Sequence, residues 1–385
     1  MSGSTSVKNA PAARRLRVCL VGPSLDILGG QAVQLERLRA GLSESSVVEV
    51  GFLPVNPRLP GPFRHLQRLK YVRTVATSVA YLWSLLRRVG HYDIVHAFSA
   101  SYWSYVLAPL PAMLVGRLYG KAVILNYHSG EAEDHLARWR HTAVPTMRLA
   151  HAIVVPSEYL VAPFARYGLR ARPVLNFVEL EKISFRCRVA PRPIFLSNRN
   201  LEPLYNVACT LRAFGLIQRD YPDATLIVAG EGSSRASLES LAVSLQLRNV
   251  EFVGRTPHEQ MGGLYDRADI YLNSSNIDNM PLSIIEAFAA GLPVVTTDAG
   301  GIPFIVRDCE NGLLVPREDH RAMAAAVLRL LREPSLATRL ASTGRDECLS
   351  KYVWPAVRKE WERVYQTVDA QARGDRPSAA VARSA

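Results

Sequence analysis

The sequence predicts an α/β fold of two Rossmann-like domains, whose parallel sheets face each other across a cleft. Three observations support this fold class. The chain has 385 residues, which is more than one hydrophobic core normally serves. Short apolar segments typical of buried parallel strands alternate with segments typical of helices. This alternation occurs twice, and the prolines of RCRVAPRP interrupt it between the two series.

The first series begins with the apolar strand LRVCLVG, residues 16–22, and a loop joins it to the helical segment GGQAVQLERLRAGL. The strand candidates VVEVGFL, DIVHAF, AVILNYH and AIVVPS follow. A glycine loop between a strand and a helix is a geometry that faces a phosphate, so Gly29 and Gly30 are candidate phosphate contacts. The spacing is not GxGxxG, and a dinucleotide site is therefore not predicted.

The second series begins near Pro193 with IFLSNRN and continues with TLIVAGEG, NVEFVG, DIYLNSS and PVVTT. We expect a first domain over residues 15–180, a second over residues 192–350, and an aromatic helix over residues 352–367. The polar residues 1–14 are expected to be a disordered leader. The residues 370–385, rich in Ser, Ala and Arg, are expected to be a disordered tail.

The positive charge lies almost entirely in the first half. The formal net charge is +12, and residues 1–185 contain 22 Lys and Arg against 11 Asp and Glu, whereas residues 186–385 contain 24 against 23. Such a field favours an anionic partner, but no nucleic-acid motif accompanies it, and no nucleic-acid partner is predicted. Five scattered cysteines and the lack of an apolar signal core favour a cytoplasmic protein.

Residues 63–88 mix basic and aromatic side chains with several leucines. Two interpretations remain open. The segment fits a helix in peripheral contact with an anionic membrane on its cytoplasmic face. It also fits a core helix with a solvated basic face.

The pattern most specific to a function is LNSSNIDNMPLSIIEAFAAGLPVVTTDAGGIPFIV, from Leu272 to Val306. Asp278 precedes a predicted helix, and Glu286 lies within that helix. Carboxylates accept hydrogen bonds from sugar hydroxyls, and the free N–H groups at a helix start suit a phosphate. The combination fits a nucleotide-sugar.

This segment resembles the signature of the family 4 glycosyltransferases, which have the GT-B fold and retain the anomeric configuration of the donor sugar. That family carries Glu-x7-Glu followed by a run like EAMAxGxPVVxTxxGG, and here Asp278 stands in place of the first glutamate. The similarity covers about residues 16–367. It implies a nucleoside-diphosphate-sugar donor, a glycan, lipid-linked or small-molecule acceptor on the first domain, and a last helix that crosses back to that domain.

The resemblance also implies roles for individual residues. Glu286 would bind the ribose, Asp278 would face the donor sugar, and Arg199 would hold the diphosphate. His128, at the carboxyl end of a predicted strand, would face the donor from the first domain. Further donor contacts are implied for Gly29, Gly30, Gly230, Phe252, Val253, Gly254, Asn279, Met280, Pro281 and Leu282.

Three assignments stay open. Tyr205 stands where the family has a lysine that helps Arg199 to neutralise the departing diphosphate, and loss of one such group typically costs about two decades in rate. His96 ends the strand DIVHAF and is either structural or faces the acceptor. Glu131 either binds the acceptor or belongs to a solvated loop.

No cofactor is expected beyond the nucleotide-sugar co-substrate. No metal is expected either, because no DxD run ends a strand and the histidines are not spaced as ligands. Two rival functions remain open. A nucleotide-sugar 2-epimerase would share the architecture and convert the donor without an acceptor. A non-catalytic protein that binds a nucleotide-sugar or a partner protein would be consistent with Tyr205.

Overall fold

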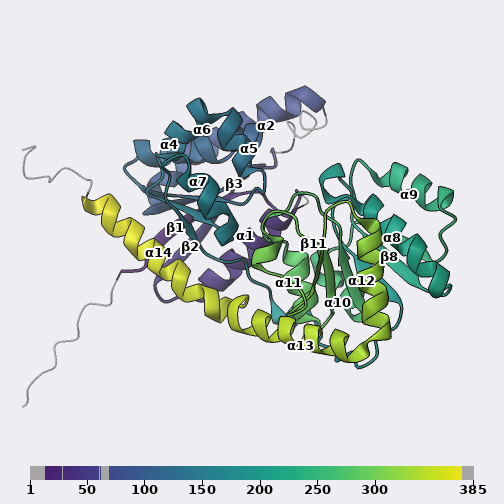
Figure 1. Cartoon of the computed structure of the whole chain (residues 1–385). Coiled ribbons are helices and arrows are strands. Elements are labelled where there is room, and N and C mark those ends of the chain that lie inside the picture. Colours follow the sequence, from purple (N-terminus) through teal and green to yellow (C-terminus); the bar gives the residue numbers. More distant parts are fainter. Residues whose placement is uncertain (1–13, 28, 60, 62–68, 375–385) are drawn as a thin grey trace, which may run out of the picture.

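The computed structural model describes residues 14–27, 29–59, 61 and 69–374. Within them the chain forms two six-stranded parallel sheets with helices packed around each, which confirms the predicted α/β class (Figure 1). Except for Arg14, the leader expected at residues 1–14 lies outside the described residues.

The first sheet has the strand order β2-β1-β3-β4-β5-β6, and neighbouring strands pair in parallel. Its strands are β1 (Leu16–Gly22), β2 (Val48–Pro54), β3 (Ile94–Ser99), β4 (Ala122–Tyr127), β5 (Ala152–Val155) and β6 (Ala171–Pro173). Its helices are α1 (Gly30–Ser43), α2 (Lys70–Arg88), α3 (Tyr102–Leu107), α4 (Pro109–Leu118), α5 (Ala132–Arg138), α6 (Arg140–Met147) and α7 (Val161–Ala165). Every residue of β3 and β4 is buried, as expected for parallel strands covered on both faces.

The second sheet has the order β12-β11-β10-β7-β8-β9, again parallel throughout. Its strands are β7 (Ile194–Ser197), β8 (Thr225–Ala229), β9 (Val250–Gly254), β10 (Ile270–Asn273), β11 (Val294–Thr297) and β12 (Leu313–Val315). Its helices are α8 (Val207–Asp220), α9 (Arg235–Ser244), α10 (His258–Arg267), α11 (Leu282–Ala289), α12 (His320–Arg332) and α13 (Pro334–Lys351). The sequence patterns did not anticipate β6 and β12, which have three residues each.

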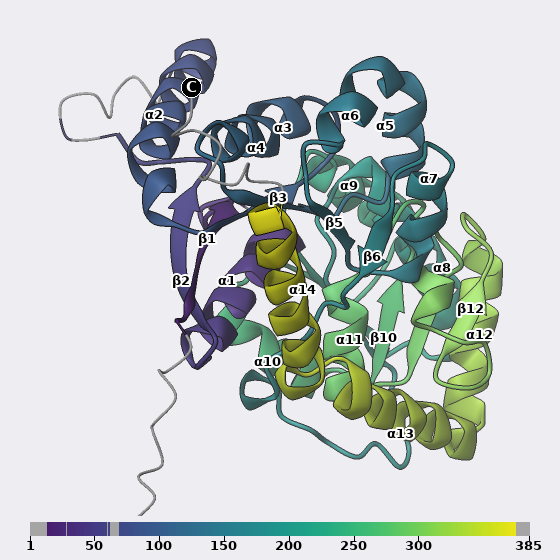
Figure 2. The same cartoon turned by 90° about the vertical axis from the view of Figure 1, so that its left-hand side faces the viewer.

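Helix α14 (Trp354–Gly374) leaves the second half of the molecule and runs across the first (Figures 1 and 2). Its buried residues Val357, Trp361, Tyr365 and Val368 join the hydrophobic cluster that includes strands β1, β3 and β4. The spacing of these residues places one face of the helix against the first sheet.

The helix continues to Gly374, so the expectation of a disordered tail from residue 370 is wrong for residues 370–374. The composition of the tail suggested disorder, but Ala372 continues the buried face by one further turn. Residues 375–385 lie outside the described part of the chain.

The loop between β10 and α11 brings the two halves into contact. Asn279 Nδ2 donates a hydrogen bond to the carbonyl of His128 at 3.4 Å, and Asn176 Nδ2 donates to the carbonyl of Met280 at 3.3 Å. Ser157 Oγ also donates to Asn279 Oδ1. Residues of the first half therefore contact the loop that carries Asp278.

Candidate active site

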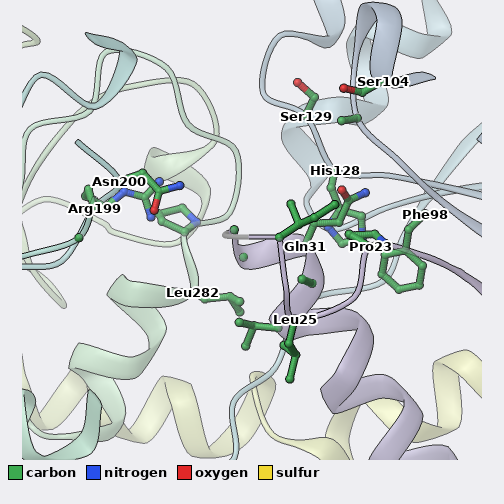
Figure 3. A pocket seen from close by; sticks show the side chains of 18 of the residues that line it. Pro23, Leu25, Gln31, Phe98, Ser104, His128, Ser129, Arg199, Asn200 and Leu282 are labelled. Carbon is green, nitrogen blue, oxygen red and sulfur yellow. The ribbon is translucent and has the colours of Figure 1, made fainter. Parts of the chain in front are cut away.

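A cavity of about 1210 Å³ lies between the two sheets (Figure 3). Its wall is built from residues at or just after the carboxyl ends of β1, β3, β4 and β5 on one side and of β7, β8, β9 and β10 on the other. Open parallel sheets bind ligands at these strand ends. The predicted cleft is therefore present, and each domain contributes to it.

Asp278 and Arg199 form an ion pair in the wall of the second domain. Asp278 Oδ2 accepts hydrogen bonds from Arg199 Nη2 at 2.6 Å and from Ser275 Oγ at 3.1 Å. Arg199 Nη1 donates to Ser283 Oγ at 3.2 Å. Burial is the largest single influence and lowers the pKa of the Arg199 guanidinium, but the Asp278 carboxylate and the neighbouring tyrosines together outweigh it and hold this pKa above its usual value.

Two glycines allow the backbone to pack tightly behind this pair. A Cβ on Gly230 would lie 2.3 Å from the carbonyl oxygen of Arg199, and a Cβ on Gly300 would lie 2.1 Å from that of Asp278. Both residues also have positive φ, +138° and +52°. Side chains at either position would displace the backbone that carries the ion pair.

Glu286 is almost completely buried, yet it lines the cavity. Its Oε1 accepts a hydrogen bond from Arg37 Nη2 at 2.6 Å, and its Oε2 accepts one from Tyr265 OH at 2.7 Å. Burial and the adjacent carboxylate raise the pKa of Tyr265 well above its usual value, so this phenol remains a donor. Because Arg37 belongs to α1, both halves of the molecule contact Glu286.

His128 lines the cavity from the first domain, across from Arg199 and Asn200 (Figure 3). Its ring stacks on Phe98 with 5.2 Å between centroids, and its buried Nε2 has no hydrogen-bond partner among the described residues. Burial lowers the pKa of His128 to about 3, so the imidazole is neutral near pH 7. A neutral ring with an unused nitrogen can contact a ligand without adding charge.

The residues left open by the sequence fall into two groups. Tyr205 and Glu131 line the cavity, and the guanidinium carbon of Arg199 lies 4.2 Å from the centre of the Tyr205 ring. The cavity-lining residues described do not include His96. Its Nδ1 lies 3.0 Å from the hydroxyl of Tyr365, so this histidine sits in the core between β3 and α14.

Most of the predicted donor contacts line the cavity: Gly29, Gly30, Gly230, Asn279, Met280, Pro281 and Leu282. Phe252, Val253 and Gly254 do not, since they belong to the edge strand β9, and the following residues from Arg255 to His258 form the wall instead. The sequence patterns also missed Arg37 and Tyr265, which hold Glu286. The sequence feature that could have pointed to Arg37 was its place in the helix that follows Gly29 and Gly30.

Two family models match consecutive parts of the chain. Residues 28–182 match the model of Glycosyltransferase Family 4, and residues 182–347 match that of Glycosyl transferases group 1. The chain belongs to the family 4 glycosyltransferases. It is therefore a glycosyltransferase, and the predicted family is confirmed.

Two relatives and one solved structure extend this comparison. The glycogen synthase of Mycobacterium tuberculosis is 29% identical over 303 residues, which cover 74% of this chain and 70% of the relative. The GDP-mannose-dependent alpha-(1-6)-phosphatidylinositol monomannoside mannosyltransferase of Mycolicibacterium smegmatis is 25% identical, with 72% and 71% covered. The sucrose-phosphate synthase from Thermosynechococcus elongatus superposes with a TM-score of 0.75 at 20% identity, covering 93% of this glycosyltransferase and 100% of that chain. This structural likeness confirms the GT-B fold.

The buried histidines predict how the stability of the glycosyltransferase depends on pH. Burial lowers the pKa of both His96 and His128 from 6.5 to about 3, with the charge of His128 adding to the effect on His96. Between about pH 3 and pH 6.5 these histidines bind protons in the unfolded chain but not in the folded protein. The free energy of unfolding therefore has its full value above pH 6.5 and decreases as the pH falls. Each histidine contributes roughly 1 kcal/mol per pH unit to this decrease.

Urea unfolding between pH 7.5 and 5.0 measures this dependence. This range lies above the pKa values of Glu179. A hydrogen bond to His258 is the main cause that lowers the pKa of this carboxyl from 4.5 to about 2, although burial acts to raise it. The slope should decrease in His96→Gln and remain unchanged in His141→Gln, which alters an exposed histidine. Equal slopes in the wild type and His96→Gln would contradict the assignment.

Proposed function

We propose that this glycosyltransferase transfers a sugar from a nucleoside-diphosphate-sugar to an acceptor with retention of the anomeric configuration and without a metal. The observation that carries the proposal is the alignment of Asp278, Arg199 and Glu286 along one wall of a cleft between two parallel sheets. The printed name of the M. smegmatis relative, which is GDP-mannose-dependent, supports this donor class.

The donor would extend along the wall formed by the second domain. Glu286 accepts hydrogen bonds from ribose hydroxyls, and Arg199 holds the diphosphate. Asp278 faces the hydroxyls of the donor sugar, beside the first residues of α11, where helical N–H groups have no intrahelical acceptors. The neutral His128 approaches the sugar from the opposite domain.

The chemical step proceeds on one face of the sugar. The bond from the anomeric carbon to the diphosphate oxygen breaks as the bond to the acceptor oxygen forms, and the acceptor proton passes to a departing phosphate oxygen. No protein base is needed. Arg199 and the start of α1 at Gly29-Gly30 stabilise the charge on the diphosphate, and the closed cleft limits hydrolysis of the donor.

Calorimetric titration with UDP, GDP and ADP in the presence of EDTA tests the donor site. We expect micromolar affinity for one nucleotide and a loss of about tenfold or more in Glu286→Gln, because a neutral amide accepts ribose hydrogen bonds less well. Glu310→Gln, at an exposed glutamate, is the matched control. Absence of binding by the wild type would contradict the donor site and favour a non-catalytic protein that binds a partner protein, and conversion of the donor without an acceptor would favour the epimerase.

The position of Tyr205 beside Arg199 leads to a second prediction, which concerns kcat. Tyr205 places an uncharged ring beside Arg199, where the family has a cation. Tyr205→Lys should raise kcat by about tenfold or more, since a preorganised cation stabilises the departing diphosphate. Tyr205→Met controls for loss of the ring and should not raise kcat. If the lysine variant is no faster than the methionine variant, the leaving group is neutralised elsewhere.

The acceptor side of the cleft is bordered by α2, whose inner side lines the cavity in the first half of the helix and packs into the core in the second half, while its outer side is exposed. The cavity-lining residues are Arg73, Thr74, Thr77 and Ser78. Tyr81 and Leu85 are buried in the core. The outer side exposes Val72, Val75, Val79, Leu82, Trp83 and Leu86. The neighbouring Trp103, Leu107, Leu114 and Leu118 of α3 and α4 are exposed as well.

The sequence around α2 is basic. Between Glu49 and Glu131 the sequence has nine Lys and Arg, and Asp93 is its one acidic residue. An exposed apolar helix face within a positive field fits the surface of an anionic membrane. In the described residues no helix is long and apolar enough to cross a bilayer. We propose that α2 rests on such a membrane and that the acceptor is lipid-linked.

Co-sedimentation with vesicles tests this surface. The wild type should bind vesicles that contain anionic phosphatidylglycerol at low salt, and it should bind phosphatidylcholine vesicles much less. Val75→Ser combined with Val79→Ser should reduce binding about tenfold, because it removes apolar area from the interface. Val243→Ser, at an exposed valine of α9 in the other domain, should change nothing. Failure of the wild type to bind, or equal binding by the double variant, would exclude this face of α2 as the membrane-binding surface.

A further inference from the structure

Arg37 is a buried cation that the first domain inserts into the site of the second. It lies on α1, two turns after Gly30, and its side chain is 2% exposed. Figure 1 shows α1 beside α11, which carries Glu286. Arg37 Nη2 donates to Glu286 Oε1 at 2.6 Å, and Nη1 donates to the carbonyl oxygen of Phe177 at 3.1 Å.

Because Arg37 pairs with Glu286, the stabilisation of the Glu286 carboxylate charge depends on the first domain. The side chain of Glu286 is 8% exposed, and a buried carboxylate without a partner is unfavourable. Tyr265, from the second domain, donates one hydrogen bond to it but supplies no charge. The countercharge comes from Arg37, and it is available only while α1 lies against α11.

The contact does not block Glu286. A carboxylate has about four acceptor positions, and the two observed hydrogen bonds use one on each oxygen. Glu286 still lines the cavity, so positions remain for ligand hydroxyls. Arg37 thus fixes the orientation of the Glu286 carboxylate and supplies its countercharge.

We propose that Arg37 is a positioning residue for the nucleotide ribose, which couples selection of the ribose hydroxyls to closure of the two domains. The inference rests on the proposed role of Glu286 in donor binding. In the closed molecule Glu286 is held by Arg37 and Tyr265 and accepts from the ribose hydroxyls. When α1 moves away, Glu286 loses its countercharge and recognises these hydroxyls less well. Only the closed form therefore selects a ribonucleotide strongly.

A purely structural role is the alternative that the test must exclude. Arg37 Nε lies 3.5 Å from Glu179 Oε2, and Nη2 lies 3.1 Å from His258 Nε2. These contacts and the one to Phe177 would join the domains even if Glu286 bound no ligand. Such a role would weaken the binding of every nucleotide equally.

The experiment compares two ligands in four proteins. The ligands are the one of UDP, GDP and ADP that the wild type binds, and the 2′,3′-dideoxy form of the same nucleotide. The proteins are the wild type, Arg37→Met, Arg37→Lys and Arg39→Met. Arg39 lies on the same helix but is exposed and pairs with Glu36, so it is the matched control. Thermal unfolding of each protein shows whether it is folded. If Arg37→Met is unfolded, Arg37→Lys takes its place in the comparison.

The wild type and Arg39→Met should prefer the ribonucleotide by about tenfold or more, the value of hydrogen bonds to a charged group. In Arg37→Met this preference should fall to about threefold or less, and Arg37→Lys should restore part of it. A preference that stays unchanged in a folded Arg37→Met protein, whatever happens to overall affinity, would overturn the proposal. Absence of nucleotide binding by the wild type would instead refute the proposed donor site, and the inference with it.

Discussion

The buried carboxylate of Glu286 is the constraint on which the arrangement of the two domains depends. It lies inside a helix whose eight residues are all buried, in a position where an unpaired charge would be costly. The fold meets this requirement with Tyr265 from α10 and Arg37 from α1. The contact between domains is therefore an electrostatic requirement of the site as well as a result of packing.

The second ion pair, between Asp278 and Arg199, depends on backbone packing in the same region. Gly230 and Gly300 let neighbouring strand-end loops approach more closely than any Cβ would permit. The pair is thus held by its own domain, whereas Glu286 is held jointly. This difference means that opening of the cleft would affect the ribose end of the proposed donor site more than the diphosphate end.

Much of this architecture could be predicted from the sequence, because long apolar strands and the segment around Asp278 and Glu286 are strong local signals. The short strands β6 and β12 are too brief to leave a periodic pattern. The partner of His96 could not be predicted, since Tyr365 is 269 positions away and meets it only through the return of α14. Arg37 was missed for the same reason, because its burial results from the second domain rather than from its own helix.

The two domains divide the chemistry of the proposed reaction. The second half of the chain has little net charge and contains most of the predicted donor contacts, whereas the basic first domain borders the cavity with the polar residues of α2. Tyr205 is the departure from the family pattern with the clearest consequence, because it leaves Arg199 without its usual neighbouring cation.

The most direct measurement is a crystal structure of the protein with its bound nucleoside diphosphate. The account predicts ribose hydroxyls within hydrogen-bond distance of Glu286, with Arg37 still paired to that carboxylate and Arg199 on the diphosphate. A nucleotide bound elsewhere, or a ribose that displaces Arg37 from Glu286, would contradict it.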